Sequence, residues 1–166
     1  MTWVGYGVSF QTPPGATIFP DTSRFAGLPG ARVEAFVGGG DVPDFVVNIA
    51  ARPSRDVEAL STWLDSLRAA RNQRLDGKLA QLAPPKTRPV GTFEGRELLP
   101  FCGDCAAHEV YVQTDSYRVA FEYSLESGSL LSRLQQDSLY ERMLQSVQSS
   151  ATRLSNKRLK LSGAHK

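Results

Sequence analysis

The spacing of apolar residues changes twice along this chain, from a period of two to a helical period and back to two. A period of two is typical of half-buried strands, whereas recurrence at three and four residues is typical of an amphipathic helix. Short turns rich in Gly, Asp and Ser separate the strand-like segments, which favours hairpins over long crossovers. The sequence therefore predicts an α+β fold, an antiparallel sheet with helices packed on its faces.

Four strands are predicted before the first helix. Alternating apolar residues predict a strand over 4–10, which a Pro-Pro-Gly run at 13–15 ends, and a short strand over 16–19. Segments 32–37 and 45–51 are predicted to pair as a hairpin around a glycine-rich turn.

A long helix is predicted over residues 56–74, with Ser54 or Asp56 as its N-cap. Pro84 and Pro85 prevent any continuation. The residues that recur at three and four positions on one face of this helix, an apolar face widened by Trp63 and ending in a charged residue, are Val57, Leu60, Leu64, Leu67 and Arg71.

Three further strands are predicted over 90–102, 105–113 and 117–123, joined by short turns into a β-meander. The spacing of Ser138 and Glu141 matches a capping box. It predicts a second helix whose stripe consists of Leu139, Met143 and Val147.

Composition supports one globular domain, since 41% of the residues are hydrophobic and 22% are charged. We assign this single α+β domain to residues 1–150. Residues 1–10 lack the basic start and apolar run of a signal peptide, and no apolar run is long enough to span a membrane. We therefore expect a cytoplasmic protein. A chain from which a leader had been removed would look the same and would be extracytoplasmic.

Residues 151–166 form a basic tail, which we expect to be flexible. The tail contains five basic residues and no acidic one. It could contact an anionic partner through Arg153, Lys157, Arg158 and Lys160, or it could be a solvated terminus. No aromatic residue lies among these charges, which disfavours binding of single-stranded nucleic acid.

Several short motifs resemble those of the PsbP-like superfamily, which includes the DcrB-like bacterial proteins. They are YGVSFQTP at 6–13, GRE at 95–97, EVYV at 109–112 and YERMLQSV at 140–147. The resemblance covers about residues 3–148. It implies an α/β/α sandwich and a mostly non-enzymatic family of photosystem subunits, nuclear-import cofactors, lipoproteins and secretion-system effector chaperones. No catalytic residues are shared within that family, so none is implied here.

A Cys-x-x-Cys motif at Cys102 and Cys105 departs from the family pattern and has three interpretations. A thioredoxin-type site places its first Cys at a helix N-terminus, but the residues that follow here alternate as a strand. Zinc would require four ligands, and only His108 nearby and His165 in the tail could complete the set. If Gly103-Asp104 is a two-residue turn, the two Cα atoms lie within about 7 Å, near the span of a disulfide. A disulfide or two inert thiols is favoured.

Other motifs favour structural roles over functional ones. His108 and Glu109 are neighbours on a predicted strand and point to opposite faces, which disfavours acid/base work. The turn at 38–41 lacks the ending of a phosphate-binding loop. Four aromatic residues could line a pocket, although their spacing is more typical of a core: Trp63, Tyr111, Phe121 and Tyr123.

Two functional hypotheses remain, and neither requires a cofactor. The first is a non-enzymatic protein-binding module that serves as an adaptor, a chaperone or an accessory subunit of a larger assembly, with a protein partner or a second copy of the chain. The second is a thiol-dependent redox protein or sensor that uses Cys102 and Cys105.

Overall fold

The structure is a computed structural model that describes residues 1–20, 30–37, 39–54, 59–74, 83–98, 107–126 and 128–150. Neither described helix is long and apolar enough to cross a membrane. In chain order the described elements are β1 (Thr2–Gly5), β2 (Val8–Gln11), β3 (Thr17–Pro20), β4 (Gly30–Ala35), β5 (Phe45–Pro53), α1 (Leu60–Arg74), β6 (Lys86–Val90), β7 (Phe93–Leu98), β8 (Ala107–Gln113), β9 (Tyr117–Ser124), α2 (Arg133–Gln145) and β10 (Gln148–Ser149).

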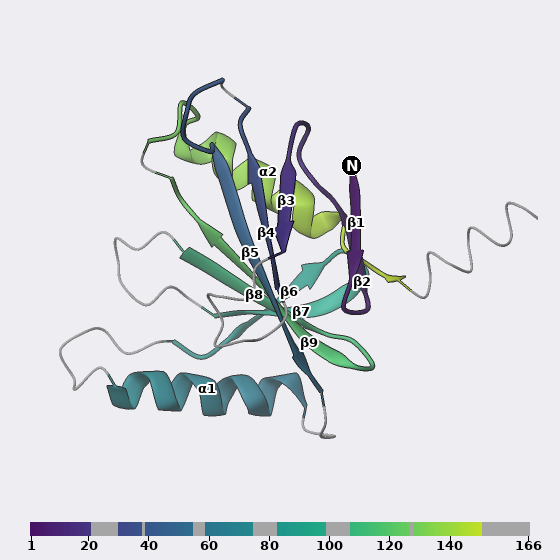
Figure 1. The fold of residues 1–166 in the computed structure, drawn as a ribbon. Helices are drawn as coiled ribbons and strands as arrows, with labels where there is room; N and C mark the ends of the chain where they lie inside the picture. Colours follow the sequence, from purple (N-terminus) through teal and green to yellow (C-terminus); the bar gives the residue numbers. More distant parts are fainter. Residues whose placement is uncertain are drawn as a thin grey trace, which may run out of the picture.

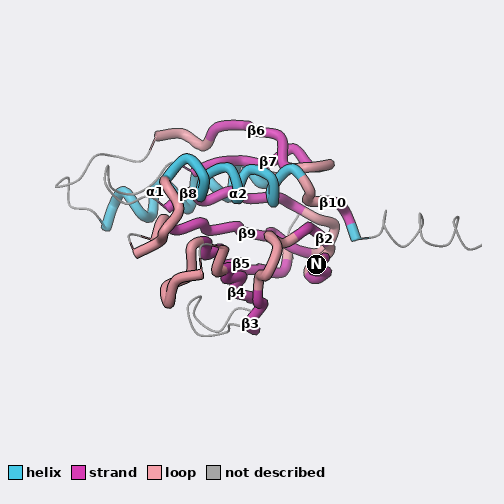
Figure 2. Tube along the Cα trace, turned by 90° about the horizontal axis from the view of Figure 1, so that it is seen from above, coloured by secondary structure: helices cyan, strands magenta, loops and turns pink. Residues whose placement is uncertain are grey.

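The described strands form two antiparallel sheets. The larger has seven strands in the order β3-β4-β5-β9-β8-β7-β6, and the smaller has three in the order β1-β2-β10. Helix α1 lies along one face of the large sheet, and α2 lies on the other face (Figure 1). Figure 2 shows β2 and β10, from opposite ends of the described chain, side by side. The predicted α+β class, with helices on both faces of an antiparallel sheet, is confirmed.

The two faces of the large sheet are packed very differently. On the α2 face, side chains from β2, β5, β8, β9 and α2 form an extensive apolar core that includes Phe121, Tyr123 and Tyr140. On the α1 face, only a small buried cluster joins the helix to β7 and β8: Leu60, Leu64, Leu98 and Tyr111. Strand β5 is covered on both faces, which explains its nearly continuous apolar run.

The predicted hairpin between 32–37 and 45–51 is confirmed as β4 and β5, and the predicted meander as β7, β8 and β9. The single strand predicted over 4–10 is wrong, because the chain reverses at Tyr6 and Gly7 to form the β1-β2 hairpin. Both turn residues have positive φ, 52° and 80°, as a two-residue hairpin turn requires. Apolar alternation continues through this turn, so periodicity alone could not locate it.

A strand start at Val90 is also wrong, because the chain already pairs from Lys86 onward and turns at Gly91. The resulting strand, β6, contains Pro89 and lies at the edge of the sheet, where a missing N–H can be tolerated. Residues 99–106, which include the end of the strand predicted over 90–102, lie outside the described residues.

Both predicted helices are present, but their starts differ from the prediction. The first hydrogen bond of α1 runs from the Trp63 N–H to the carbonyl of Ala59, so the helix is capped at Ala59 and the predicted N-cap at Ser54 is wrong. Ser54 follows β5 and donates its N–H to the carbonyl of Ser116. Asp56 and Val57 lie outside the described residues.

Helix α2 begins one turn or more before the predicted capping box. Its N-cap is Ser132, whose side chain accepts from the Gln135 N–H while the Gln135 side chain accepts from Ser132 in return. Ser138 lies within the helix. Both serines satisfy the same four-residue pattern, so the pattern could not distinguish the true start. The stripe residues Leu139 and Met143 are buried as predicted.

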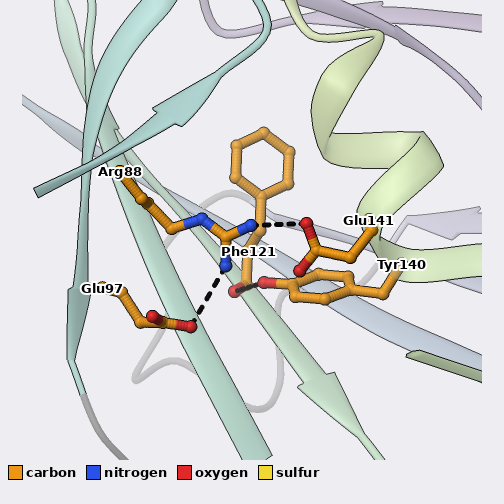
Figure 3. A network of polar contacts seen from close by, with 5 residues as sticks. All are labelled: Arg88, Glu97, Phe121, Tyr140 and Glu141. Carbon is orange, nitrogen blue, oxygen red and sulfur yellow. Dashed lines mark hydrogen bonds and ion pairs between the residues drawn. The ribbon is translucent and has the colours of Figure 1, made fainter. Parts of the chain in front are cut away.

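A polar network joins α2 to the edge hairpin β6-β7 (Figure 3). The Arg88 guanidinium donates to Glu97 at 3.1 Å and to Glu141 of α2 at 2.6 Å. Burial opposes the charge on Arg88, but the hydrogen bond and charge of Glu141 and the charge of Glu97 outweigh it, so its pKa is raised. The Tyr140 hydroxyl donates to the carbonyl of Phe121 at 3.0 Å, and burial raises the pKa of Tyr140 well above its usual value.

Replacing Arg88 by Met should lower the free energy of unfolding by about 1–2 kcal/mol, because both charge-assisted hydrogen bonds are lost while the side-chain stem is kept. The effect is limited because the Glu141 side chain is 46% exposed and solvent screens that pair. Urea unfolding of Arg88→Met measures the change. Arg142→Met, on the exposed side of α2, is the control and should stay within about 0.5 kcal/mol of the original chain. Equal effects of the two substitutions would show that the network does not hold α2 to the hairpin.

Candidate functional site

A pocket with a volume of about 120 Å³ lies between α1 and the large sheet, and we call it the α1 pocket. It lies on the α1 face of the large sheet, beside the small cluster (Figure 1). Ten described residues from α1, β5, β8 and β9 line it: Ala50, Arg52, Trp63, Leu67, Arg71, Glu109, Tyr111, Arg118, Ala120 and Glu122.

The position of α1 explains why this space exists. Leu60 and Leu64 pack in the small cluster with Leu98 of β7 and Tyr111 of β8, which anchors the helix over those two strands. The floor beside the helix consists of Ala50 and Ala120, which are direct cross-strand partners. Because both side chains are single methyl groups, they leave room above the sheet that larger residues would fill.

The wall of the α1 pocket is aromatic and apolar. Trp63 and Leu67 are one helical turn apart and therefore share a face of α1. The Trp63 ring meets the Tyr111 ring edge to face, with centroids 5.6 Å apart. Since Tyr111 is also part of the buried cluster, this contact fixes Trp63 relative to the sheet.

One end of the α1 pocket is basic. Arg52 on β5 and Arg118 on β9 are direct cross-strand partners. Their guanidinium carbons lie 5.8 and 5.3 Å from the centre of the Trp63 ring, within the range of a cation–π contact. Arg118 is only 6% exposed. Two positively charged side chains therefore lie close to the indole ring of Trp63.

The other end contains a paired carboxylate. One guanidinium nitrogen of Arg71 contacts both oxygens of Glu109, at 3.0 and 2.8 Å, and the Tyr111 hydroxyl donates to the same carboxylate. Burial opposes the charge on Arg71, but the charge and hydrogen bond of Glu109 outweigh it and raise its pKa. Burial and the neighbouring Glu109 raise the pKa of Tyr111, which keeps its hydroxyl a donor. Glu109 is therefore engaged by two donors.

The polar face continues past the α1 pocket to Asn48. Register places Asn48 between Arg32 on β4 and Glu122 on β9, on the same face as Ala50 and Arg52. It is 1% exposed, and neither atom of its amide has a hydrogen-bond partner. A buried amide without partners is rare in folded proteins.

This arrangement is suited to binding. The exposed Arg52 guanidinium can donate to an anionic group, and the alanine floor and Trp63 can accept an apolar one. Within the described ranges, no three His, Cys, Asp or Glu side chains are grouped so that they could hold a metal ion.

The predicted aromatic set is divided between the two faces. Phe121 and Tyr123 lie in the main core, as the core interpretation predicted. Tyr111 belongs to the small cluster, Trp63 packs against that cluster, and both line the α1 pocket. Of the predicted turn at 38–41, residues 39–41 lie between β4 and β5, and Gly38 lies outside the described residues.

Several predicted sites lie outside the described residues: Cys102, Cys105, Arg153, Lys157, Arg158 and Lys160. The backbone of His108 belongs to β8, next to that of Glu109.

The sequence analysis missed the arginines of the α1 pocket. A usable signal is present in β9, where Arg118, Ala120 and Glu122 alternate with apolar residues. This alternation marks one polar face but does not show which arginine of another strand lies opposite.

No protein-family model matches this chain, and no curated protein sequence matches it. A crystal structure of a protein from Bacteroides thetaiotaomicron VPI-5482 resembles it with a TM-score of 0.46 and 10% sequence identity. The alignment covers 89% of this chain and 47% of that one, so this chain spans about half the length of the Bacteroides protein.

Proposed function

We propose that this chain is a non-enzymatic protein-binding module and that the α1 pocket is the centre of its binding surface. The observation that carries the proposal is the gathering of Trp63, Tyr111 and three arginines around one pocket. Trp, Tyr and Arg are the residues that dominate binding energy at protein interfaces, where they surround small desolvated pockets. Their rigid or planar groups provide contact area at low conformational cost.

The size of the α1 pocket supports a protein partner over a cofactor. Pockets that bury drug-sized ligands have volumes of about 300–1,000 Å³. A volume of about 120 Å³ suits one side chain or a chain terminus instead. An anchor of this kind, with the surrounding surface of β5 and α1 as its rim, is the usual anatomy of a protein interface.

The resemblance to the PsbP-like superfamily supports the same proposal. Its members are mostly non-enzymatic proteins that work within larger assemblies, and their sandwich architecture is that of an antiparallel sheet between helices. We accordingly propose that the chain is a PsbP-like adaptor, chaperone or accessory subunit.

Affinity capture from an extract of the source cells tests the proposal with three immobilised chains: the original, Arg52→Glu and Arg142→Glu. Arg52 is exposed at the α1 pocket, and Arg142 is exposed on α2 across the sheet, so the two reversals change charge equally at different sites. We expect the original chain and Arg142→Glu to retain the same partner. Arg52→Glu should reduce its recovery about tenfold or more, because a hot-spot contact is lost.

Quantitative mass spectrometry of the three captures provides the readout. Circular dichroism of each variant confirms that it is folded before use. A partner recovered equally with all three chains would contradict the assignment of the α1 pocket as the binding site.

A further inference from the structure

We infer that the α1 pocket holds an uncharged, branched aliphatic side chain of the partner, of the size of leucine. This inference rests on the proposed function and identifies the chemistry of the anchor. Ala50 and Ala120 form the floor on which this side chain lies, and Trp63 and Leu67 form the wall that it contacts.

The charged side chains around the α1 pocket are already engaged within the chain. Arg71 and Glu109 form an ion pair at 2.8 Å, and the Tyr111 hydroxyl donates to the same carboxylate. Arg118 and Glu122 each have interaction partners as well. Because these four charged groups are engaged, an ion brought among them would lose its hydration without gaining a free counter-charge from them. Charge complementarity therefore favours an uncharged occupant.

The floor of the α1 pocket is apolar and lower than the sheet surface around it. Ala50 and Ala120 are direct cross-strand partners, and the next pair on either side along this face consists of much longer side chains. The alanine pair therefore forms a depression, which Leu67 and the Trp63 ring border from the helix. An aliphatic side chain placed there removes its own apolar surface and that of the floor from water.

The volume of the α1 pocket limits the size of the occupant. An engineered apolar cavity of about 150 Å³ is large enough to bind benzene. The α1 pocket has a volume of about 120 Å³, which favours a branched aliphatic side chain over an aromatic ring. Its wall resists expansion, because the Trp63 ring packs edge to face against Tyr111 with centroids 5.6 Å apart, and Tyr111 is itself buried.

Arg52 places a hydrogen-bond donor at the exposed side of the α1 pocket. Its side chain is exposed, and its guanidinium carbon lies 5.8 Å from the centre of the Trp63 ring. A donor at this place can bind a main-chain carbonyl of the partner next to the inserted residue. The aliphatic side chain then supplies burial and the carbonyl supplies orientation, a division that is common in binding pockets.

Nuclear magnetic resonance titration of the full chain tests the inference with neutral probes that differ in one side chain. N-acetyl-leucine methylamide carries the proposed anchor. N-acetyl-asparagine methylamide has nearly the same shape but is polar, N-acetyl-alanine methylamide lacks the branched end, and N-acetyl-phenylalanine methylamide is larger. The chain has two tryptophans, so the indole N–H of Trp63 reports on the α1 pocket while that of Trp3, in the small sheet, is an internal control.

We expect the leucine probe to shift the Trp63 signal at concentrations of about 10–100 mM, since a single anchor provides only part of the affinity of a whole interface. It should bind about tenfold more tightly than the asparagine and alanine probes, because only its side chain buries apolar surface on the floor. The phenylalanine probe should bind more weakly than the leucine probe. Added NaCl should leave binding unchanged, because no charged group of the probe is involved.

Two variants distinguish binding in the α1 pocket from a general effect on the fold. Ala120→Leu places a leucine of the chain itself on the floor and should abolish the Trp63 shift, whereas Ala69→Leu, on the exposed side of α1, should leave it unchanged. Leu67→Ala enlarges the α1 pocket, so the phenylalanine probe should then bind several-fold more tightly than the leucine probe. An unfolded chain cannot gain such a preference, so Leu67→Ala decides the test if Ala120→Leu does not fold.

Three results would overturn the inference: equal binding of the leucine and asparagine probes, no shift of the Trp63 signal with the leucine probe over that range, or a shift that a folded Ala120→Leu chain retains. Capture of a partner that is lost with Arg52→Glu would still stand in each case. Conversely, capture that does not depend on Arg52 would contradict the proposed function without changing the measured preference of the α1 pocket. The two failures are therefore distinguishable.

Discussion

Replacing Gly91 by Ala should lower the free energy of unfolding by about 3–5 kcal/mol, the largest effect we expect from a single methyl group in this chain. Gly91 lies in the β6-β7 turn, with φ of +55°, and a Cβ atom there would stand 1.7 Å from the carbonyl oxygen of Val147. That carbonyl also accepts the Thr92 N–H at 3.0 Å. The turn and the residue after α2 are therefore in direct backbone contact, and neither can move without breaking this hydrogen bond.

Gly15→Ala is the matched control. Gly15 also has positive φ, +71°, but no atom lies within 4 Å of a Cβ built there. Its substitution should cost only the strain of a left-handed alanine, about 1–2 kcal/mol. Urea unfolding followed by circular dichroism measures both changes. If the two variants lose the same stability, the close approach of Gly91 to Val147 does not exist in solution.

Replacing Leu64 by Ala should lower the free energy of unfolding by about 2–5 kcal/mol, because the side chain is fully buried and its removal leaves a cavity. Leu64 is the centre of the small cluster that holds α1 on the sheet, next to Leu60, Leu98 and Tyr111. Few other buried contacts secure this helix, so hydrogen exchange in α1 should become faster than in α2. The free energy of unfolding and the rate of hydrogen exchange in α1 thus both report on the packing of Leu64 against the sheet.

Leu134→Ala provides the control for helix propensity. Leu134 lies in α2 and is 81% exposed, so its loss should change stability by less than about 0.5 kcal/mol. A change below about 0.5 kcal/mol for Leu64→Ala as well would mean that α1 presents a different face to the sheet.

The sequence pattern was sufficient to predict those elements whose structure depends on residues close together in the chain. The hairpin of β4 and β5, the turn between β8 and β9 and the helical stripe at Leu60 and Leu64 all depend on spacing and turn residues within a short window. The α+β class followed from the order of these elements, because amphipathic helices must cover a sheet.

Patterns that fit two places equally well were resolved only by tertiary contacts. The alternation through Tyr6 and Gly7 is the same for one strand as for two, and contact with β10 and the main core selects the hairpin. Likewise, Ser132 and Ser138 both have a capping partner three residues on, and packing of the helix decides which one caps it. Strand β6 has little strand signal of its own and exists because β7 offers it a partner.

The candidate site could not be predicted from the sequence pattern of any single segment. Arg52 and Arg118 belong to strands that are distant in the chain, and only the register of β5 against β9 makes them direct partners. A shift of β5 by one residue relative to β9 would turn Arg52 to the face opposite Arg118, so no local signal could have predicted their meeting. The sequence by itself determined the element types and the polar alternation of each strand. The tertiary structure decided which charges share the α1 pocket, because cross-strand pairing and the offset of α1 toward β7 and β8 are set by packing over the whole sheet.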